Sequence, residues 1–173
     1  PLPSAAERWD VSPDGLTYTF HLREGVKFHD GTPLTAEAAL WSFQRQMDAK
    51  HPGHVPGASF EYWATLYKDV DAVRASGPMT LEFHLKQPNA ALLSSIAIFP
   101  AFLISPRALE EHGAEFQRWP VGTGPYRFVS WTPKQAIVLE ANPDYWDNSA
   151  PPQFKRMVFK VVPENSVRLL EFK

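Results

Sequence analysis

The stretch between residues 9 and 46 constrains the fold of this chain more than any other part. It reads WDVSPDGLTYTFHLREGVKFHDGTPLTAEAALWSFQRQ, with Pro, Asp and Gly gathered at residues 12–15 and 29–33. Such clusters favour tight turns, because Pro presets φ and Gly tolerates positive φ. Between the turns, residues 17–22 place an apolar side chain at every second position. This alternation predicts a strand with one buried face.

A helix is predicted directly after the second turn. Val26 and Phe28 first give a short second strand-like run. Thr35 can then cap a helix, because its side-chain oxygen can accept a hydrogen bond from a free N–H of the first turn. The apolar residues that follow recur at the spacing of one helix face. They are Ala36, Ala39, Leu40, Phe43 and Met47.

The same stretch resembles a known signature. Residues 12–46 are similar to the large solute-binding proteins of bacterial ABC importers, which take up oligopeptides, dipeptides, nickel chelates and haem. Ala38 and Ala39 depart from the Asp-Val common in that family, at a helix that we interpret as a packing element. Two later runs also match it: VGTGPY at residues 121–126 and NPDYW at residues 142–146. We interpret the last run as a structural corner with a buried Trp146.

The resemblance implies a fold and a division into domains. We expect an α+β lobe fragment with a mixed, mainly antiparallel sheet and flanking helices, as part of a periplasmic-binding-protein-like type II fold. Residues 1–120 would form the inserted α+β subdomain of lobe I, and residues 121–173 part of its ligand-facing region. Members of the family are much longer, so we expect this sequence to be a fragment that lacks the second lobe.

Composition limits the classes of function. The 173 residues are 44% hydrophobic and 21% charged, with a formal net charge of −2 and no cysteine. A near-neutral chain lacks the basic excess that nucleic-acid binding requires, so we expect no nucleic-acid partner. The lack of cysteine excludes disulfides and thiolate metal sites within the chain. No apolar run approaches the roughly 20 residues that span a bilayer.

Further elements follow from periodicity and turn residues. We predict hairpins over residues 70–85 and 126–140, a helix over 91–97, a buried extended segment over 98–104, a helix capped by Ser105 and ending near Gly113, a strand over 154–162 and a helix over 167–172. Residues 48–60 are rich in Gly, Pro and His and predict a loop. Within it, His51 and His54 favour a solvated loop over a metal site, since only Asp48 offers a further ligand.

Aromatic residues after this loop are the candidate binding residues. Phe60, Tyr62, Trp63 and Tyr67 fit either a short helix with its rings in the core or an aromatic wall on a cleft. The run GASFEYW resembles GGSYEYF of dipeptide-binding members, and a Trp lines the cleft at the position of Trp63 in nickel- and haem-binding members. Nickel-binding members carry Arg where Phe102 stands. The predicted ligand-binding residues are therefore Phe60, Tyr62, Trp63 and Phe102.

The sequence favours binding over catalysis. No serine has the context of a nucleophile elbow, and the acidic residues are scattered, so we predict no enzyme, no cofactor and no metal site. The resemblance implies a monomeric substrate-binding component of an ABC transporter that captures di- or oligopeptides and delivers them to permease subunits, in the periplasm or lipid-anchored outside the membrane. A nickel-chelate or haem carrier, a sensing or interaction module and a hydrolase completed by absent sequence remain alternatives.

Overall fold

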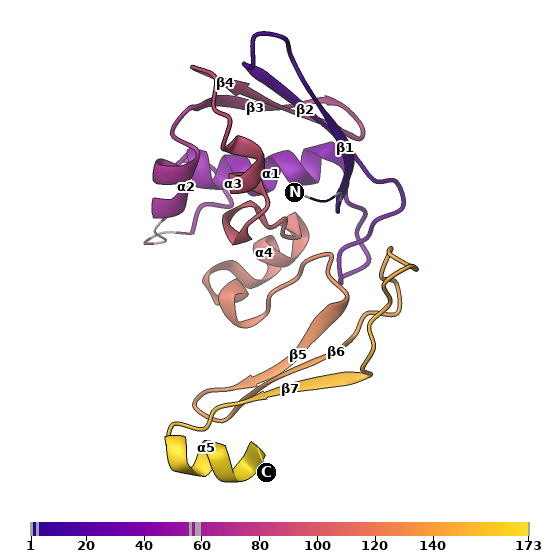
Figure 1. Cartoon of the computed structure of the whole chain (residues 1–173), viewed down its shortest axis with the longest axis vertical. Helices are drawn as coiled ribbons and strands as arrows, with labels where there is room; N and C mark the ends of the chain where they lie inside the picture. Colours follow the sequence, from indigo (N-terminus) through magenta and orange to yellow (C-terminus); the bar gives the residue numbers. More distant parts are fainter. Residues whose placement is uncertain (1, 3, 56, 58–59, 173) are drawn as a thin grey trace. The chain divides into compact units, whose positions relative to one another are not determined.

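The structure, a computed structural model, divides into two compact units. Unit 1 comprises residues 1–123 and unit 2 residues 124–173. The structure describes residues 2, 4–55, 57 and 60–172 (Figure 1). Unit 1 combines an antiparallel sheet with several helices and unit 2 combines one with a single helix, which confirms the predicted α+β class.

Unit 1 contains a four-stranded sheet in the order β1-β2-β4-β3. Its strands are β1 (Ala6–Val11), β2 (Thr17–Leu22), β3 (Val70–Gly77) and β4 (Thr80–Leu85). The alternation predicted for β2 is confirmed, because every second side chain from Tyr18 to Leu22 is buried. The hairpin of β3 and β4 is also confirmed. Strand β1 was not predicted, since it is an edge strand whose residues are mostly exposed and show no alternation of apolar side chains.

Helix α1 (Ala36–Met47) lies along one face of this sheet (Figure 1). Its predicted cap is confirmed: the Thr35 hydroxyl accepts a hydrogen bond of 3.2 Å from the Ala38 N–H. The Phe43 ring meets the Phe83 ring of β4 edge to face, with centroids 5.0 Å apart. Phe20 of β2 contacts the other side of Phe83 at 5.5 Å. These rings fix α1 against the middle of the sheet.

Short helices complete unit 1. They are α2 (Glu61–Leu66), α3 (Leu92–Ile96), the 3₁₀ helix η1 (Phe99–Ala101), α4 (Pro106–His112) and the 3₁₀ helix η2 (Gly113–Arg118). The ends predicted for α4 are confirmed. The Ser105 hydroxyl accepts from the Ala108 N–H at 3.1 Å, and Gly113 takes a φ of 52°, which a side chain would strain.

Two predictions for unit 1 are wrong. Val26 and Phe28 are buried, but only an isolated bridge between Lys27 and Pro33 forms there, not a strand. Residues 98–104 are neither extended throughout nor buried, because η1 interrupts them and Phe99 and Phe102 are 55% and 69% exposed.

Polar side chains of α1 explain the course of residues 98–104. The buried Ser42 hydroxyl donates to the Ile104 carbonyl at 3.2 Å and accepts from its N–H at 3.1 Å. The Gln46 amide donates to the Pro100 carbonyl at 3.0 Å. The backbone of this segment is therefore attached to the helix while its aromatic rings face outward.

Unit 2 is a three-stranded antiparallel sheet in the order β5-β6-β7, followed by one helix. Its elements are β5 (Tyr126–Thr132), β6 (Ala136–Ala141), β7 (Arg156–Lys160) and α5 (Asn165–Phe172). The hairpin, the last strand and the helix are confirmed, although β7 is shorter than predicted. Lys134 in the hairpin turn takes a φ of 63°.

The corner at residues 142–146 is held by Asn142 rather than by a buried tryptophan. The Asn142 N–H donates to the Pro125 carbonyl at 2.8 Å, and its side-chain amide donates to the Gly124 carbonyl at 3.1 Å. Asn142 is buried, whereas Trp146 is half-buried, so the prediction of a buried Trp146 is wrong. The corner thus connects the NPDYW run to the GTGPY run.

Candidate functional site

Tyr62 of α2 and Phe99 of η1 form an exposed aromatic pair on unit 1. Their ring centroids lie 4.8 Å apart in an edge-to-face arrangement. Tyr62 is 54% exposed and Phe99 is 55% exposed. Phe102, immediately after η1, is 69% exposed. We call Tyr62, Phe99 and Phe102 the aromatic patch. Covering the exposed half of one such ring contributes about 2 kcal/mol, so the patch can bind an apolar surface.

Trp63, the residue after Tyr62 in α2, packs against rings of the core. Its ring is 4.8 Å from the Tyr67 ring and 6.1 Å from the Phe43 ring. Tyr67 is buried and its hydroxyl donates to the Ser95 carbonyl at 2.6 Å. Burial raises the pKa of Tyr67 to about 12, so the hydroxyl remains protonated and keeps this donor role. Trp63 is half-buried, so both interpretations of the aromatic run apply to different members of it.

Phe60 has different surroundings from the other predicted residues. Its ring packs 5.1 Å from the His54 ring, and the Arg45 guanidinium carbon lies 5.1 Å from its centroid. It lines a cavity of about 390 Å³ together with residues of α4 and η2. The four predicted site residues therefore do not share one environment: Tyr62 and Phe102 are exposed, Trp63 joins the core and Phe60 borders this cavity.

Two residues of interest were not predicted. Phe99 was assigned to a buried segment, although Pro100 within that apolar run was a sign that the backbone turns there. Arg45 carries no prediction. No local sequence pattern marks it, because its cavity combines Val55, Gly57 and Phe60 with residues of α4 and η2 more than 60 positions away.

The loop with His51 and His54 packs against α1 instead of extending into solvent. His51 meets Trp41 edge to face at 5.1 Å, and His54 Nδ1 lies 2.9 Å from the Arg45 carbonyl. A Cβ on Gly53 would lie 2.3 Å from the Trp41 ring, so only glycine fits this approach. The predicted loop is confirmed for residues 48–55, 57 and 60, with residues 48–50 exposed, whereas His51 and His54 themselves are half-buried against α1; residues 56, 58 and 59 lie outside the described part. Within the described part of the chain, no three His, Asp or Glu side chains gather as metal ligands.

Asp30 holds the turn that the first signature contains. Its carboxylate accepts from the Thr32 N–H at 2.9 Å, from the Thr32 hydroxyl at 2.6 Å and from the Ser105 hydroxyl. The Arg107 guanidinium donates to the Asp30 carbonyl at 2.6 Å. Burial opposes the charge, but these hydrogen bonds and Arg107 hold the pKa of Asp30 below its usual value. The signature therefore preserves a structural corner of unit 1.

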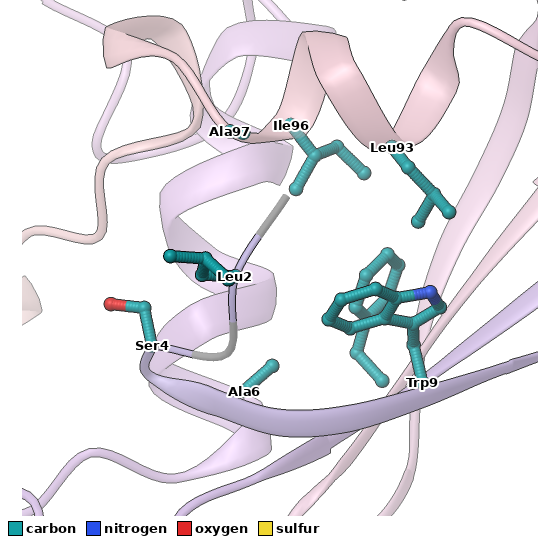
Figure 2. Close-up of a pocket in the computed structure, with 8 residues that line it drawn as sticks. Leu2, Ser4, Ala6, Trp9, Leu93, Ile96 and Ala97 are labelled. Atoms are coloured by element: carbon teal, nitrogen blue, oxygen red, sulfur yellow. The ribbon is translucent and has the colours of Figure 1, made fainter.

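A small apolar cavity lies elsewhere in unit 1, between β1 and α3 (Figure 2). Figure 2 shows Trp9 reaching from the strand toward Leu93 and Ile96 of the helix. The cavity has a volume of about 150 Å³, and Leu2, Ser4, Ala6, Phe20 and Ala97 complete its lining. It includes none of the predicted site residues and offers no charged side chain to orient a polar ligand.

The fold of the two units places this chain in the class of periplasmic binding proteins, of which it forms a part. A binding protein from Helicobacter pylori, described as the ABC transporter-associated DppA in complex with the peptide STSA, matches 98% of this chain with a TM-score of 0.89 and 34% identity. HbpA2 from Haemophilus parasuis matches 96% with a TM-score of 0.87 and 31% identity. The chain covers 35% of each of these two structures.

Sequence comparison gives the family. The model described as "Bacterial extracellular solute-binding proteins, family 5 Middle" matches residues 1–173, so the chain belongs to this family of solute-binding proteins. The chain is 35% identical to the dipeptide-binding protein of Escherichia coli over 96% of its own length, and 36% identical to di/tripeptide-binding protein 4 of Pseudomonas aeruginosa over 97%. It spans about a third of the length of both relatives, 34% in each case. No described helix is long and apolar enough to cross a membrane.

Proposed function

We propose that this chain is part of the substrate-binding component of an ABC transporter that captures short peptides for import. The observation that carries the proposal is the exposed aromatic patch on a chain of family 5, whose relatives include dipeptide- and di/tripeptide-binding proteins. Tyr62 and Phe102 contact the ligand in this proposal, Phe99 joins them through its contact with Tyr62, and Trp63 attaches α2 to the core through Tyr67.

The patch suits a peptide for a physical reason. Aromatic rings provide a large contact area with few rotatable bonds, so they bind apolar side chains of varied shape at little entropic cost. The peptide backbone would take its hydrogen bonds from a second lobe, which the length of the relatives leaves room for. Ligand then bridges two lobes and stabilises their closed arrangement.

The partners and location follow from this role. We propose that the protein acts as a monomer in the periplasm, or lipid-anchored outside the membrane, and presents its ligand to permease subunits. It performs no reaction on the ligand. Residues 1–120 belong to the inserted subdomain of lobe I in this proposal, and residues 121–173 to its ligand-facing region. A nickel chelate has less support, because the uncharged Phe102 stands where the resemblance implies arginine.

Native mass spectrometry of the full-length protein tests the proposal. Peptides of two to five residues should co-purify with it, and calorimetry with a defined dipeptide should give one saturable site. Tyr62→Ala and Phe102→Ala should each weaken this binding about thirtyfold with unchanged thermal unfolding, because each removes about half a ring of contact, or about 2 kcal/mol. Val129→Ala, which alters an exposed apolar residue of unit 2, is the matched control. Unchanged affinity in both ring variants would remove the patch from the site.

A further inference from the structure

The guanidinium of Arg45 lies largely inside unit 1 without an anion. Arg45 is on α1, and its Nε is buried with no hydrogen-bond partner. Among the residues that the structure describes, no carboxylate lies within ion-pair distance of it. Its guanidinium carbon lies 5.1 Å from the centroid of the Phe60 ring. Burial lowers the pKa of Arg45, which reflects the cost of holding this charge away from water.

Acidic residues of α4, η2 and the end of α1 have other partners. Glu111 of α4 pairs with Arg107 at 3.6 Å, and Glu115 of η2 pairs with Arg118 at 3.3 Å. Asp48, at the end of α1, accepts a hydrogen bond from the Lys50 N–H at 2.8 Å. These carboxylates are thus engaged locally, and the charge of Arg45 is left to face the cavity.

The cavity beside Arg45 has one cation and mostly apolar walls. Its volume is about 390 Å³, within the range of small-molecule sites. Leu109 of α4 and Phe116 of η2 contribute apolar side chains to its lining, and Gln117 adds a side-chain amide. A single planar guanidinium matches the two oxygens of one carboxylate, whereas a phosphate dianion would leave charge uncompensated.

We propose that this cavity, the Arg45 cavity, binds a small organic acid. The carboxylate pairs with the Arg45 guanidinium, and the apolar body of the ligand lies against Leu109 and Phe116. Phe60 stacks on the other face of the guanidinium and keeps it oriented. The inference goes beyond the proposed peptide site, because it requires neither the aromatic patch nor a second lobe.

Calorimetry on the full-length protein with 3-phenylpropionate tests the charge requirement. The acid should bind at one saturable site, and the neutral 3-phenylpropanamide should bind about ten- to hundredfold more weakly, since it cannot form a charge-assisted pair. Equal binding of the acid and the amide, or no saturable binding of the acid, would overturn the proposal.

Variants locate the binding. Arg45→Gln should weaken binding of the acid by the same ten- to hundredfold, while Arg118→Gln, which removes an equal charge from neighbouring η2, should leave it unchanged. Gln117→Trp, which enlarges an exposed side chain in the lining and leaves Arg45 in place, should also weaken it, and serves if Arg45→Gln fails to fold. Unchanged affinity in folded Arg45→Gln, or in Gln117→Trp, contradicts the assignment.

Two further titrations separate a free acid from the carboxylate of a peptide. If the cavity takes peptide carboxylates, Ala-Phe should compete with 3-phenylpropionate and Ala-Phe-amide should not. If it takes free acids, neither dipeptide competes. Comparing Ala-Phe binding in the wild type and Tyr62→Ala measures binding at the aromatic patch. Failure of the proposed peptide function would change this result, and failure of the Arg45 cavity would change the 3-phenylpropionate titration.

Discussion

Unit 1 and unit 2 differ in how far their own residues cover their apolar side chains. The buried rings of unit 1 contact one another around Phe83, with Phe20 on one side and Phe43 on the other. In unit 2, Val138 is the single buried apolar side chain among those the structure describes. Phe154 and Phe159 there are 65% and 52% exposed. Sheet formation alone therefore does not make a core: unit 1 has one because a capped helix covers its sheet.

Truncation of a ring in each sheet tests this difference most strongly. Phe83→Ala should lower the free energy of unfolding by about 3–5 kcal/mol, because it leaves a cavity between α1 and β4. Phe159→Ala, at a ring already 52% exposed, should lower it by less than about 1 kcal/mol. Urea unfolding measures both. An equal cost for the two variants would show that unit 2 has a covered face, contrary to the comparison.

The next test asks how far the core of unit 1 extends toward the surface. Trp63→Ala should lower the free energy of unfolding by about 2 kcal/mol, because the half-buried ring contacts Phe43 and Tyr67. Phe102→Ala, its exposed counterpart, should change it by less than about 0.5 kcal/mol. Thermal and urea unfolding, combined with peptide calorimetry, separate the two roles. If Trp63→Ala leaves the free energy of unfolding unchanged and only weakens peptide binding, Trp63 is a surface residue of the site.

A polar corner of unit 1 should respond to acid. Asp30→Asn should lower the free energy of unfolding by about 1–2 kcal/mol at pH 7. The Thr32 and Ser105 hydroxyls donate to different carboxylate oxygens, and the amide nitrogen that replaces one of these oxygens cannot accept a proton. Asp30 has a lowered pKa in the folded chain, so its stabilisation is complete above the unfolded value of about 3.9 and is lost as pH falls through the folded pKa.

Urea unfolding between pH 7 and pH 2 measures this acid dependence. The stability difference between the wild type and Asp30→Asn should shrink as the pH decreases below about 4. Asp71→Asn, at an exposed position of β3, is the control and should show little difference at any pH. A constant difference across the range would mean that Asp30 contributes through packing and not through its charge.

Local patterns predicted most elements of both units. The alternation in β2, the Thr35 and Ser105 caps and the turns of both hairpins depend on residues close in sequence, and all are confirmed. The prediction for residues 98–104 was wrong, because an apolar run indicates burial only if nothing else positions its backbone. Here Ser42 and Gln46, more than 50 positions away, hold that backbone and turn the rings outward.

For the candidate site, the sequence predicted the type of residue but not which residues pair. The sequence pointed to aromatic residues near α2, but the pairing of Tyr62 with Phe99 depends on η1, which was not predicted. Phe60 was grouped with Tyr62 and Trp63 because they are neighbours in sequence. Phe60 precedes the first residue of α2, with a φ of −108° and a ψ of 46° that are not helical, and its ring packs on Arg45 instead.

The smallest effect is expected at an ion pair within unit 2. Arg127 Nε lies 2.6 Å from Glu140 Oε1 across β5 and β6, and both side chains are about two-fifths exposed, at 41% and 42%. A double-mutant cycle of Arg127→Ala and Glu140→Ala should give a coupling free energy of about 0.2–1 kcal/mol, reduced in 1 M salt, because water screens an exposed pair. A coupling above about 2 kcal/mol, unchanged by salt, would show that unit 2 relies on polar contacts where unit 1 relies on packed rings. The two units would then differ in the kind of interaction that stabilises them, and not only in how completely their apolar side chains are covered.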